Sequence, residues 1–391
     1  MSTGVVVLNF GEPSEPDREA VVDYLERIFF ANADLEEYDS EQAARERSRK
    51  LAKRRAPGLI EEYEEIGGSP LNEQATRQAE ALEERLQARG FDATTYLGMQ
   101  YTEPFIEDAV EAARADGVDR VVGFPVYPLC GPSTNVISLD ELESAMAEAG
   151  LDVPFQAITG WHKHPGYNRV RAENIDTFAA ESGVDLQDPD TALVFSAHGT
   201  PQHYLEEGSR YDIYVEEFCS VVASLLGVGD YHIGFQNHEN RDIPWTEPEI
   251  EDLIGTVDAE RVVVEPVSFL HEQSETLSEL DDELAEAAEA ARLDFYRVPI
   301  PHDDERIPGI FADLVEPFLA DFDPGYYQYR QCQCRDVPGT MCLNAPQTAT
   351  DDAAAAHQAE AETDVGTDDG TGADARADGR GDADTARAED D

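Results

Sequence analysis

Lysine is scarce in this 391-residue sequence, and acidic residues far outnumber basic ones. Only Lys50, Lys53 and Lys163 occur, and 28 lysines and arginines face 84 aspartates and glutamates, for a formal net charge of −56 at pH 7. Nucleic acids and anionic lipids are polyanions that such a surface repels, so we expect no nucleic-acid partner. Carboxylates in this excess hold hydration water and are screened by molar salt. The composition therefore indicates a halophilic protein.

Long apolar segments are missing as well. No stretch approaches the roughly 18 apolar residues that a membrane-spanning helix needs, so no integral membrane segment is predicted. The N-terminus runs into an apolar strand with no basic region ahead of it, unlike a signal peptide. We therefore expect a cytoplasmic protein. Its five cysteines are then free thiols or metal ligands rather than disulfides, because the cytoplasm keeps thiols reduced.

Short apolar runs alternate with amphipathic segments along the chain. Strands are expected at 5–10, 94–99, 120–127, 155–160, 192–197, 231–236 and 261–269. Helices are expected at 16–31, 72–89, 104–116, 165–182 and 205–226, with a last one at 308–322 crossing back to the first half. This alternation predicts parallel sheets with right-handed crossovers and helices on both faces. The highly charged residues 36–56 form either an exposed helix or a flexible lip.

The fold class is therefore α/β, with two doubly wound, Rossmann-like parallel-sheet domains at residues 1–152 and 153–325. Residues 326–346 form a cysteine-containing extension. Residues 347–391 contain mainly Ala, Asp, Gly, Thr and Glu and have no aromatic residue. They can bury almost nothing and are expected to be a disordered acidic tail.

Ligands of doubly wound folds gather at the carboxyl ends of the strands, and a histidine stands at one of them. His198 lies in the stretch SAHGTP, directly after the apolar run ALVF. An imidazole there can bind a metal or accept a proton, because it titrates near neutrality. The alternative is a turn histidine that caps the following helix. Walker A, G-x-G-x-x-G, G-x-S-x-G and H-E-x-x-H signatures are absent.

Three glutamates spaced by four follow another strand end. Glu275, Glu279 and Glu283 fall on one face of the helix expected after Phe269, and Glu272 precedes them in the turn. Such a row can attract a divalent cation or carry protons away from a site. The alternative is a solvated acidic face.

A tryptophan bracketed by prolines follows the strand at 231–236. Trp245 stands in IPWTEP and is suited to cover a flat aromatic ligand. A core tryptophan is the alternative.

Taken in order, these segments resemble the ferrochelatase family over about residues 4–325. VVVLNFGEPSEP resembles the family's opening strand with its Gly-x-Pro turn, and EEYEEIGGSPL resembles its IGG-(x)-SP-L segment. SAHGTP matches its SAH-[SG]-x-P signature, and IPWTEP resembles its PWLGP. PVSFLHEQSETLSELD resembles its P-[IV]-x-F-x-x-D-H-x-E-x-L-x-E-L-D. The resemblance implies a chelatase fold with a porphyrin cleft between the domains, and an enzyme (a lyase) that inserts Fe²⁺ into a porphyrin in haem biosynthesis.

The resemblance also assigns roles to particular residues. His198 and Glu275 fall on the family's two catalytic metal-site positions, facing each other across the cleft on one side of the porphyrin. Glu272, Glu279 and Glu283 match its acidic path for metal or protons. The porphyrin-binding positions fall on Phe10, Arg27, Tyr63, Ser69 and Trp245. Phe10 cannot ligate iron, so no axial ligand is expected from its side.

This chain departs from the family's pattern at two places. Gln273 stands where the family has a histidine, and an amide cannot shuttle a proton; His271 lies two positions earlier. The GGSP turn is one residue shorter than in some members, which affects the assignment of Ser69.

Four of the five cysteines form a second candidate site. Cys332, Cys334 and Cys342 follow the folded body, and Cys130 stands at a strand end. The resemblance implies a [2Fe-2S] cluster, since some ferrochelatases hold one with one internal and three C-terminal cysteines. Four thiolates also suit zinc. Cys219 lies in an apolar helix and is interpreted as a core thiol.

The resemblance leaves the substrate open between coproporphyrin III, which the cysteine placement favours, and protoporphyrin IX. One alternative is a cobalt or iron chelatase for sirohydrochlorin, although such enzymes usually rely on histidine pairs. Another is a non-catalytic haem- or metal-binding protein on the same scaffold. The sequence does not determine the oligomeric state.

Overall fold

The computed structural model describes residues 2–36, 38–237, 243–320, 329–332, 334–335 and 337–344, which belong to one compact unit, Met1–Ala345. The tail expected at 347–391 and part of the extension expected at 326–346 lie outside the described residues.

The first half is built on a sheet that is parallel except for its last strand, β9 (Arg330–Gln331), and whose interior strand β1 (Thr3–Asn9) is wholly buried. Val5 and Val7 face the core beneath α3 (Leu71–Ala88), whereas Val6 and Leu8 face the core beneath α4 (Ile106–Asp116) and α5 (Ile137–Ala149). A continuous apolar run is what a strand covered on both faces requires. The strand order is β2 (Ala93–Met99), β1, β3 (Arg120–Pro125), β4 (Phe155–Ile158), followed by the short β10 (Thr340–Cys342) and β9.

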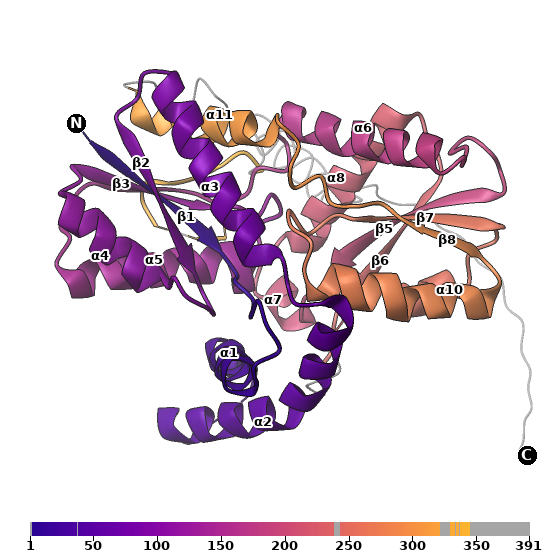
Figure 1. Ribbon diagram of the computed structural model, residues 1–391, viewed down its shortest axis with the longest axis horizontal. Helices are drawn as coiled ribbons and strands as arrows, with labels where there is room; N and C mark the ends of the chain where they lie inside the picture. Colours follow the sequence, from indigo (N-terminus) through magenta and orange to yellow (C-terminus); the bar gives the residue numbers. More distant parts are fainter. Residues whose placement is uncertain are drawn as a thin grey trace, which may run out of the picture. The chain divides into compact units, whose positions relative to one another are not determined.

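The second half repeats this plan (Figure 1). Its four parallel strands have the order β6 (Tyr231–Gln236), β5 (Thr191–His198), β7 (Arg261–Pro266), β8 (Asp294–Arg297). One face is covered by α6 (Pro165–Glu181) and α8 (Tyr211–Leu226), and the other by α9 (Ile250–Ile254), α10 (Ala285–Ala291) and η3 (Glu275–Leu284), a π-helix. The two doubly wound parallel sheets confirm the predicted fold class.

Helices α1 (Arg18–Ala31) and α2 (Glu41–Ile66) pack on each other around a small apolar cluster of their own, apart from the sheet (Figure 1). They are joined through the short 3₁₀ helix η1 (Ala33–Leu35). Of the two alternatives for residues 36–56, the helix is therefore the correct one. The helix expected at 205–226 is two helices, α7 (Gln202–Glu206) and α8, separated at Gly208, whose φ of 104° ends the first.

The boundary between the halves differs from the one expected at 152–153. β4 pairs in parallel with β3 and so belongs to the first sheet, because its residues continue that sheet before the chain crosses over. Helix α11 (Ile307–Leu319) returns to pack against α3, as expected, and β10 then pairs with β4. β8 was not expected, because the charged Asp294 and Arg297 interrupt its apolar pattern.

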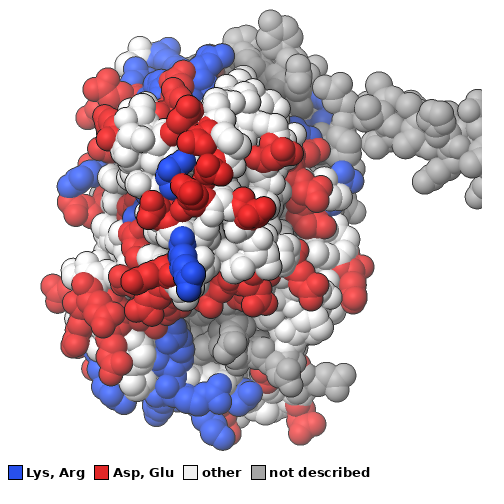
Figure 2. Space-filling view, turned by 90° about the vertical axis from the view of Figure 1, so that its right-hand side faces the viewer, with Lys and Arg blue, Asp and Glu red and all other residues white. Residues whose placement is uncertain are grey.

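Acidic side chains are spread over the face shown in Figure 2, and basic ones gather at its upper and lower edges, the lower group at the height of α2 in Figure 1. The excess of carboxylates therefore belongs to the folded body and is not confined to the terminal segment.

In the described part of the chain, every helix is too short or too polar to cross a membrane.

Candidate active site

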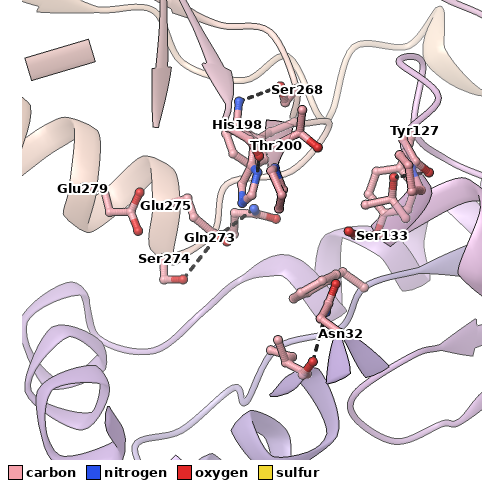
Figure 3. Close-up of a pocket in the computed structure, with 18 of the residues that line it drawn as sticks. Asn32, Tyr127, Ser133, His198, Thr200, Ser268, Gln273, Ser274, Glu275 and Glu279 are labelled. Atoms are coloured by element: carbon pink, nitrogen blue, oxygen red, sulfur yellow. Dashed lines mark hydrogen bonds between the residues drawn. The ribbon is translucent and has the colours of Figure 1, made fainter. Parts of the chain in front are cut away.

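A cavity lies between the two halves, where the carboxyl ends of the strands meet helices α1 and α2 (Figure 3). Its lining is mainly apolar and aromatic, with a small number of convergent polar groups, as ligand sites usually are. Of the residues that the sequence singles out, His198, Glu275, Glu279, Phe10 and Trp245 all line it.

His198 is the last residue of β5, and two hydrogen bonds hold it, one from its backbone N–H and one from its imidazole ring. Its N–H donates to Ser268 Oγ at 2.9 Å. Its Nδ1 lies 2.6 Å from the carbonyl oxygen of Gly199, which can only accept, so Nδ1 carries the hydrogen and Nε2 keeps the lone pair. Burial lowers the pKa of His198 and keeps the ring neutral.

Gly199 is required directly after this histidine. A Cβ on Gly199 would lie 2.7 Å from the carbonyl oxygen of Gln236, to which the Gly199 N–H also donates at 2.6 Å. The close approach of β5 and the end of β6 therefore fixes the position of the imidazole.

Glu275 begins the π-helix η3 at the edge of the cavity. Its Oε2 accepts hydrogen bonds from Gln273 Nε2 at 2.9 Å and from Ser274 Oγ at 3.1 Å. Burial and the carboxylates of Glu12 and Glu279 raise the pKa of Glu275 well above its ordinary value. The carboxyl group therefore keeps its proton to a higher pH than an exposed glutamate does, and π-helical turns are frequent at functional sites.

The other two glutamates of the row continue from Glu275 toward solvent. Glu279 is half-buried and accepts from Gln236 Nε2 at 3.0 Å, and desolvation raises its pKa to about 8. Glu283 is exposed, and its pKa is raised by partial burial and by Glu62 on α2. The row thus connects the cavity with the surface, and Glu62 lies opposite it.

Aromatic side chains form much of the remaining wall. Phe10 packs edge-on against Tyr101, with ring centroids 4.5 Å apart, and against Tyr24 at 6.2 Å. Trp245 lines the cavity beside the loop after His198, since its segment pairs with Pro201. In Figure 3, Tyr127 and Ser133 lie across the cavity from His198 and Glu275.

A buried ion pair holds the loop that carries Ser268 and Phe269. The guanidinium of Arg171 contacts Glu265 and donates to the carbonyl oxygens of Phe269, at 2.9 Å, and Pro266. Arg171 and Glu265 are both fully buried. Removing one partner would leave the other as an unpaired buried charge, so the loop is firmly anchored.

Several residues expected in the cavity lie elsewhere. Arg27 stacks on Phe105, 4.1 Å from the ring centroid, and lines a second hollow. Glu272 pairs with Arg297 at 2.7 Å and accepts from the Ile300 N–H at 2.8 Å, so its carboxylate is turned away from the row.

Tyr63 and Ser69 are buried beside Glu12, outside the cavity lining. His271 is buried against Gln78, at 2.9 Å, and burial lowers its pKa to about 3. It therefore does not replace the histidine missing at Gln273.

Two polar residues that sequence reasoning missed stand next to Glu275. Glu12 lies in the turn after β1 and reaches Ser274, the residue before the π-helix. The position of Glu12 at a strand end was the signal that could have found it.

Three cysteines lie together next to the turn that follows β3. The sulfurs of Cys130, Cys332 and Cys334 are all within 4.8 Å of one another, and Cys342 packs against Cys332. The pairing of β10 with β4 brings the C-terminal segment there. Cys219 lies on the buried face of α8, in the core, as interpreted from the sequence.

The peptide at Gly160 allows the C-terminal segment to approach this closely. A Cβ on Gly160 would lie 2.1 Å from Asn344 Nδ2 and 3.0 Å from Cys130 Cβ. Arg335 fixes the same segment through Asp140, at 2.7 Å, and Glu143. The chain is thus shaped to bring the thiols of Cys130, Cys332 and Cys334 together, with Cys342 packed beside Cys332.

The chain is similar to known proteins over nearly its whole folded length. The ferrochelatase family model matches residues 2–318. A ferrochelatase from Synechococcus sp. (strain RCC307) is 38% identical over 271 residues, which are 66% of this chain and 68% of that protein. A ferrochelatase from Gloeobacter violaceus is 33% identical over 323 residues, 80% of this chain and 96% of that protein. Among solved structures, SirB from Bacillus subtilis with Fe³⁺ is similar with a TM-score of 0.48 and 10% identity, covering 82% of this chain and 97% of that one.

Proposed function

Because the chain belongs to the ferrochelatase family, we propose that it inserts Fe²⁺ into a porphyrin held in the cavity between its two halves, with release of two protons. The observation that carries the proposal is the convergence of a neutral histidine and a high-pKa glutamate on one wall of an aromatic cavity (Figure 3). The product would serve haem biosynthesis.

His198 and Glu275 are the groups that would act on the porphyrin centre. A porphyrin must lose two pyrrole protons before it can hold a divalent metal. The lone pair on His198 Nε2 accepts one of these protons or contacts the iron, and Glu275 assists as a second base or ligand. A cleft that holds the ring bent exposes the pyrrole nitrogens, and binding energy at the rim supports that distortion.

Iron would reach the porphyrin along the row of glutamates. Glu283 is exposed, Glu279 is half-buried, and Glu275 lies at the cavity, so a cation would pass from water to the reacting centre between carboxylates. Oxygen ligands suit a divalent ion that must be released again. Glu272 is tied to Arg297, and its role is to support the start of the π-helix.

The aromatic walls would cover the two faces of the ring. Phe10 supplies no ligand atom, so iron would receive no axial ligand from its side. Trp245 covers part of the ring edge. Porphyrin binding by Arg27, Tyr63 and Ser69 would need a conformational change in the region of α1. Arg27 lines the second hollow instead of the cavity, and Tyr63 and Ser69 lie beside the buried Glu12.

Coproporphyrin III is the favoured substrate, with protoporphyrin IX as the competitor. Coproporphyrin III carries four carboxylates and is water-soluble. In the described residues, the exposed large hydrophobic side chains, Ile213, Val221 and Leu225, all lie on α8. Helices α1 and α2 at the cavity therefore present no apolar lip toward a membrane-derived substrate.

Cys130, Cys332, Cys334 and Cys342 fit a [2Fe-2S] cluster. The four thiols come from two segments that meet in a buried place, and Gly160 leaves room for that meeting. Bound there, the cluster would supply a redox-active centre and tie the C-terminal segment to the first half. Iron and acid-labile sulfide analysis of protein purified without oxygen tests this, and colourless protein with one zinc per chain would contradict it.

The protein is proposed to act in the cytoplasm of a halophilic cell. The acidic face in Figure 2 and the formal charge of −56 support a molar-salt environment.

Steady-state assays with three tetrapyrroles test the proposed function. Fe²⁺ insertion into coproporphyrin III, protoporphyrin IX and sirohydrochlorin would be followed anaerobically in molar KCl. Turnover of coproporphyrin III well above the other two is expected. Turnover of sirohydrochlorin alone, or binding of haem without turnover of any of the three, would contradict the proposal.

A further inference from the structure

On the β7 side, the ladder of backbone hydrogen bonds ends before it reaches His198. The last pair in register between β5 and β7 is Ser196 with Pro266, and the Val267 N–H donates to the Ser196 carbonyl oxygen at 2.8 Å. Two residues further along β5, the His198 N–H donates instead to a side chain, Ser268 Oγ, at 2.9 Å (Figure 3). On this side, the position of His198 therefore depends on where the serine hydroxyl lies.

A tyrosine from another element fixes that hydroxyl. Tyr211, the first residue of α8, places its hydroxyl oxygen 2.7 Å from Ser268 Oγ. A serine oxygen has two lone pairs and one hydrogen, so it accepts from His198 and shares a further hydrogen bond with Tyr211. Tyr211 thus holds the Ser268 side chain in the rotamer that meets His198.

The backbone of Ser268 is fixed independently of these contacts. Arg171 donates to the carbonyl oxygens on either side of it, those of Pro266 and, at 2.9 Å, of Phe269. Arg171 is paired with Glu265, and both are fully buried. Because the loop is anchored in this way, removing a hydroxyl group here acts on the histidine rather than on the fold.

Tyr211 is itself firmly placed at the cavity. It is 7% exposed and belongs to the large core cluster. Its ring lies beside Gly131, in the turn after β3, where a Cβ on the glycine would be 3.7 Å from the ring carbon Cδ2. Tyr211 and Ser268 both line the cavity beside His198. The chain of contacts from Tyr211 through Ser268 to His198 therefore lies next to the place of reaction.

The direction of the His198 lone pair depends on this chain of contacts. The residue is held by its N–H on Ser268 Oγ and by its Nδ1–H on the Gly199 carbonyl oxygen, 2.6 Å away. Together the two bonds fix where Nε2 points. A displacement of about 1 Å at a reacting group can cost roughly 10²-fold in rate, so losing one of these bonds should be measurable.

We propose that Tyr211 is a positioning residue for iron insertion: through the Ser268 hydroxyl it fixes the backbone of His198 and thereby the direction of the Nε2 lone pair. This inference rests on the proposed function, since it gives His198 a task at the porphyrin centre.

Single-turnover insertion with prebound porphyrin tests the proposal. Y211F should insert iron roughly tenfold more slowly and S268A roughly tenfold or more, with porphyrin affinity retained. Because Tyr211 acts through Ser268, the double variant should be no slower than S268A. S268T keeps the hydroxyl, and its methyl group has room at the half-buried cavity wall, so its rate should return toward that of the wild type.

Two variants outside this chain of contacts are the matched controls. Y231F removes a hydroxyl at the start of β6, at the opposite edge of the same sheet, and S220A removes one at an exposed position on α8. Both should insert iron at the wild-type rate.

Proton NMR of the porphyrin-free protein reads the position of the histidine without any reaction. The His198 Nδ1–H, donated to the Gly199 carbonyl oxygen, should give a downfield resonance that is missing in H198A. This resonance should shift in Y211F and S268A, and it should keep its position in S268T and in both controls.

Wild-type rates in Y211F and S268A would overturn the proposal. So would a double variant slowed by the product of the two single effects, a loss of rate that follows a loss of porphyrin affinity, or an unshifted resonance in both single variants. No insertion by the wild type, with the resonance shifting as expected, would instead overturn the proposed function.

Discussion

At the scale of single residues, the site depends on the charge state of one histidine and three glutamates. His198 is kept neutral by burial, and the Gly199 carbonyl fixes its tautomer. The glutamates are kept partly protonated by burial and by one another. One wall of the cavity thus holds a proton acceptor and proton carriers, and Arg55 on α2 is a nearby cation that lowers the pKa of Glu279 and Glu283 in part.

The first prediction concerns acidification. Because the pKa of His198 is lowered from its ordinary value of about 6.5, the ring should stay neutral down to more acidic pH than a free imidazole. Iron insertion at saturating porphyrin should therefore persist at pH 6.5 and fall only at lower pH, as the ring is protonated. A rate that falls by half at pH 7 or above would contradict this account of the site.

The second prediction concerns the entry of iron. Since the pKa of Glu279 is about 8, the carboxyl group gains its charge as the pH rises through that value. The KM for Fe²⁺ should fall over this range in the wild type, and E279Q should lose the pH dependence and raise the KM about tenfold at high pH, equivalent to about 1.4 kcal/mol. Porphyrin affinity should not change.

E286Q, an exposed carboxylate on α10, is the control for this variant. An equal rise in KM for E279Q and E286Q would show a general effect of surface charge and would contradict a path along the row.

At the scale of elements, the start of the π-helix depends on an ion-pair network behind it. Arg297, at the end of β8, contacts Glu272 at 2.7 Å and Asp281 at 2.5 Å. Glu272 in turn accepts from Thr276, in the first turn of η3. β8 therefore positions Glu275 without touching the cavity.

The third prediction follows from the burial of this network. The Arg297 and Glu272 side chains are only 9% and 12% exposed, so R297M leaves a buried charge without its partner. We expect a loss of about 3–5 kcal/mol in the free energy of unfolding, measured by denaturant titration in molar KCl.

The exposed pair of Arg77 and Glu73 on α3 provides the comparison. R77M should cost at most about 1 kcal/mol, because exposed ion pairs contribute little. Similar losses in the two variants would contradict a structural role for the Arg297 network.

Elements with a strong local signal could be predicted from the sequence. β1 and β5 have continuous apolar runs, and both were expected within two residues of their observed bounds. β8 has no such run, and β9 and β10 are too short to show any period, so their pairing depends on contacts distant in sequence. The domain boundary expected at 152–153 falls before β4, although β4 pairs with β3, because periodicity does not say which sheet a strand joins.

The residues of the candidate site likewise divide into those that a local sequence motif predicts and those that only the fold brings together. His198, Glu275 and Glu279 stand in motifs at strand ends, and the structure brings them into one cavity. Glu12 and Ser274 are 262 residues apart, and no local pattern indicates that they meet. Arg27 and Glu272 were assigned by position in a motif, but their side chains are drawn to Phe105 and Arg297 instead.

At the scale of the whole molecule, the net charge of −56 sets the conditions under which the fold is stable. Repulsion between carboxylates opposes the compact state, and salt screens it with a Debye length of about 3 Å at 1 M and about 10 Å at 0.1 M. The basic residues along α2 offset this only locally.

The fourth prediction is therefore a strong dependence of stability on salt. The melting temperature should rise steadily with KCl from 0.1 M to the molar range, as followed by circular dichroism. A melting temperature that does not change over this range would contradict the halophilic interpretation.

The central claim is that this chain inserts iron into a porphyrin with His198 at the reacting centre. A single-turnover measurement tests it most directly: porphyrin-loaded wild type and H198A are mixed anaerobically with Fe²⁺ in molar KCl, and the loss of porphyrin fluorescence is timed. The account predicts rapid insertion by the wild type and a rate lower by roughly 10²-fold or more in H198A, with porphyrin affinity retained. Equal rates in the two proteins, or no insertion by the wild type, would contradict it.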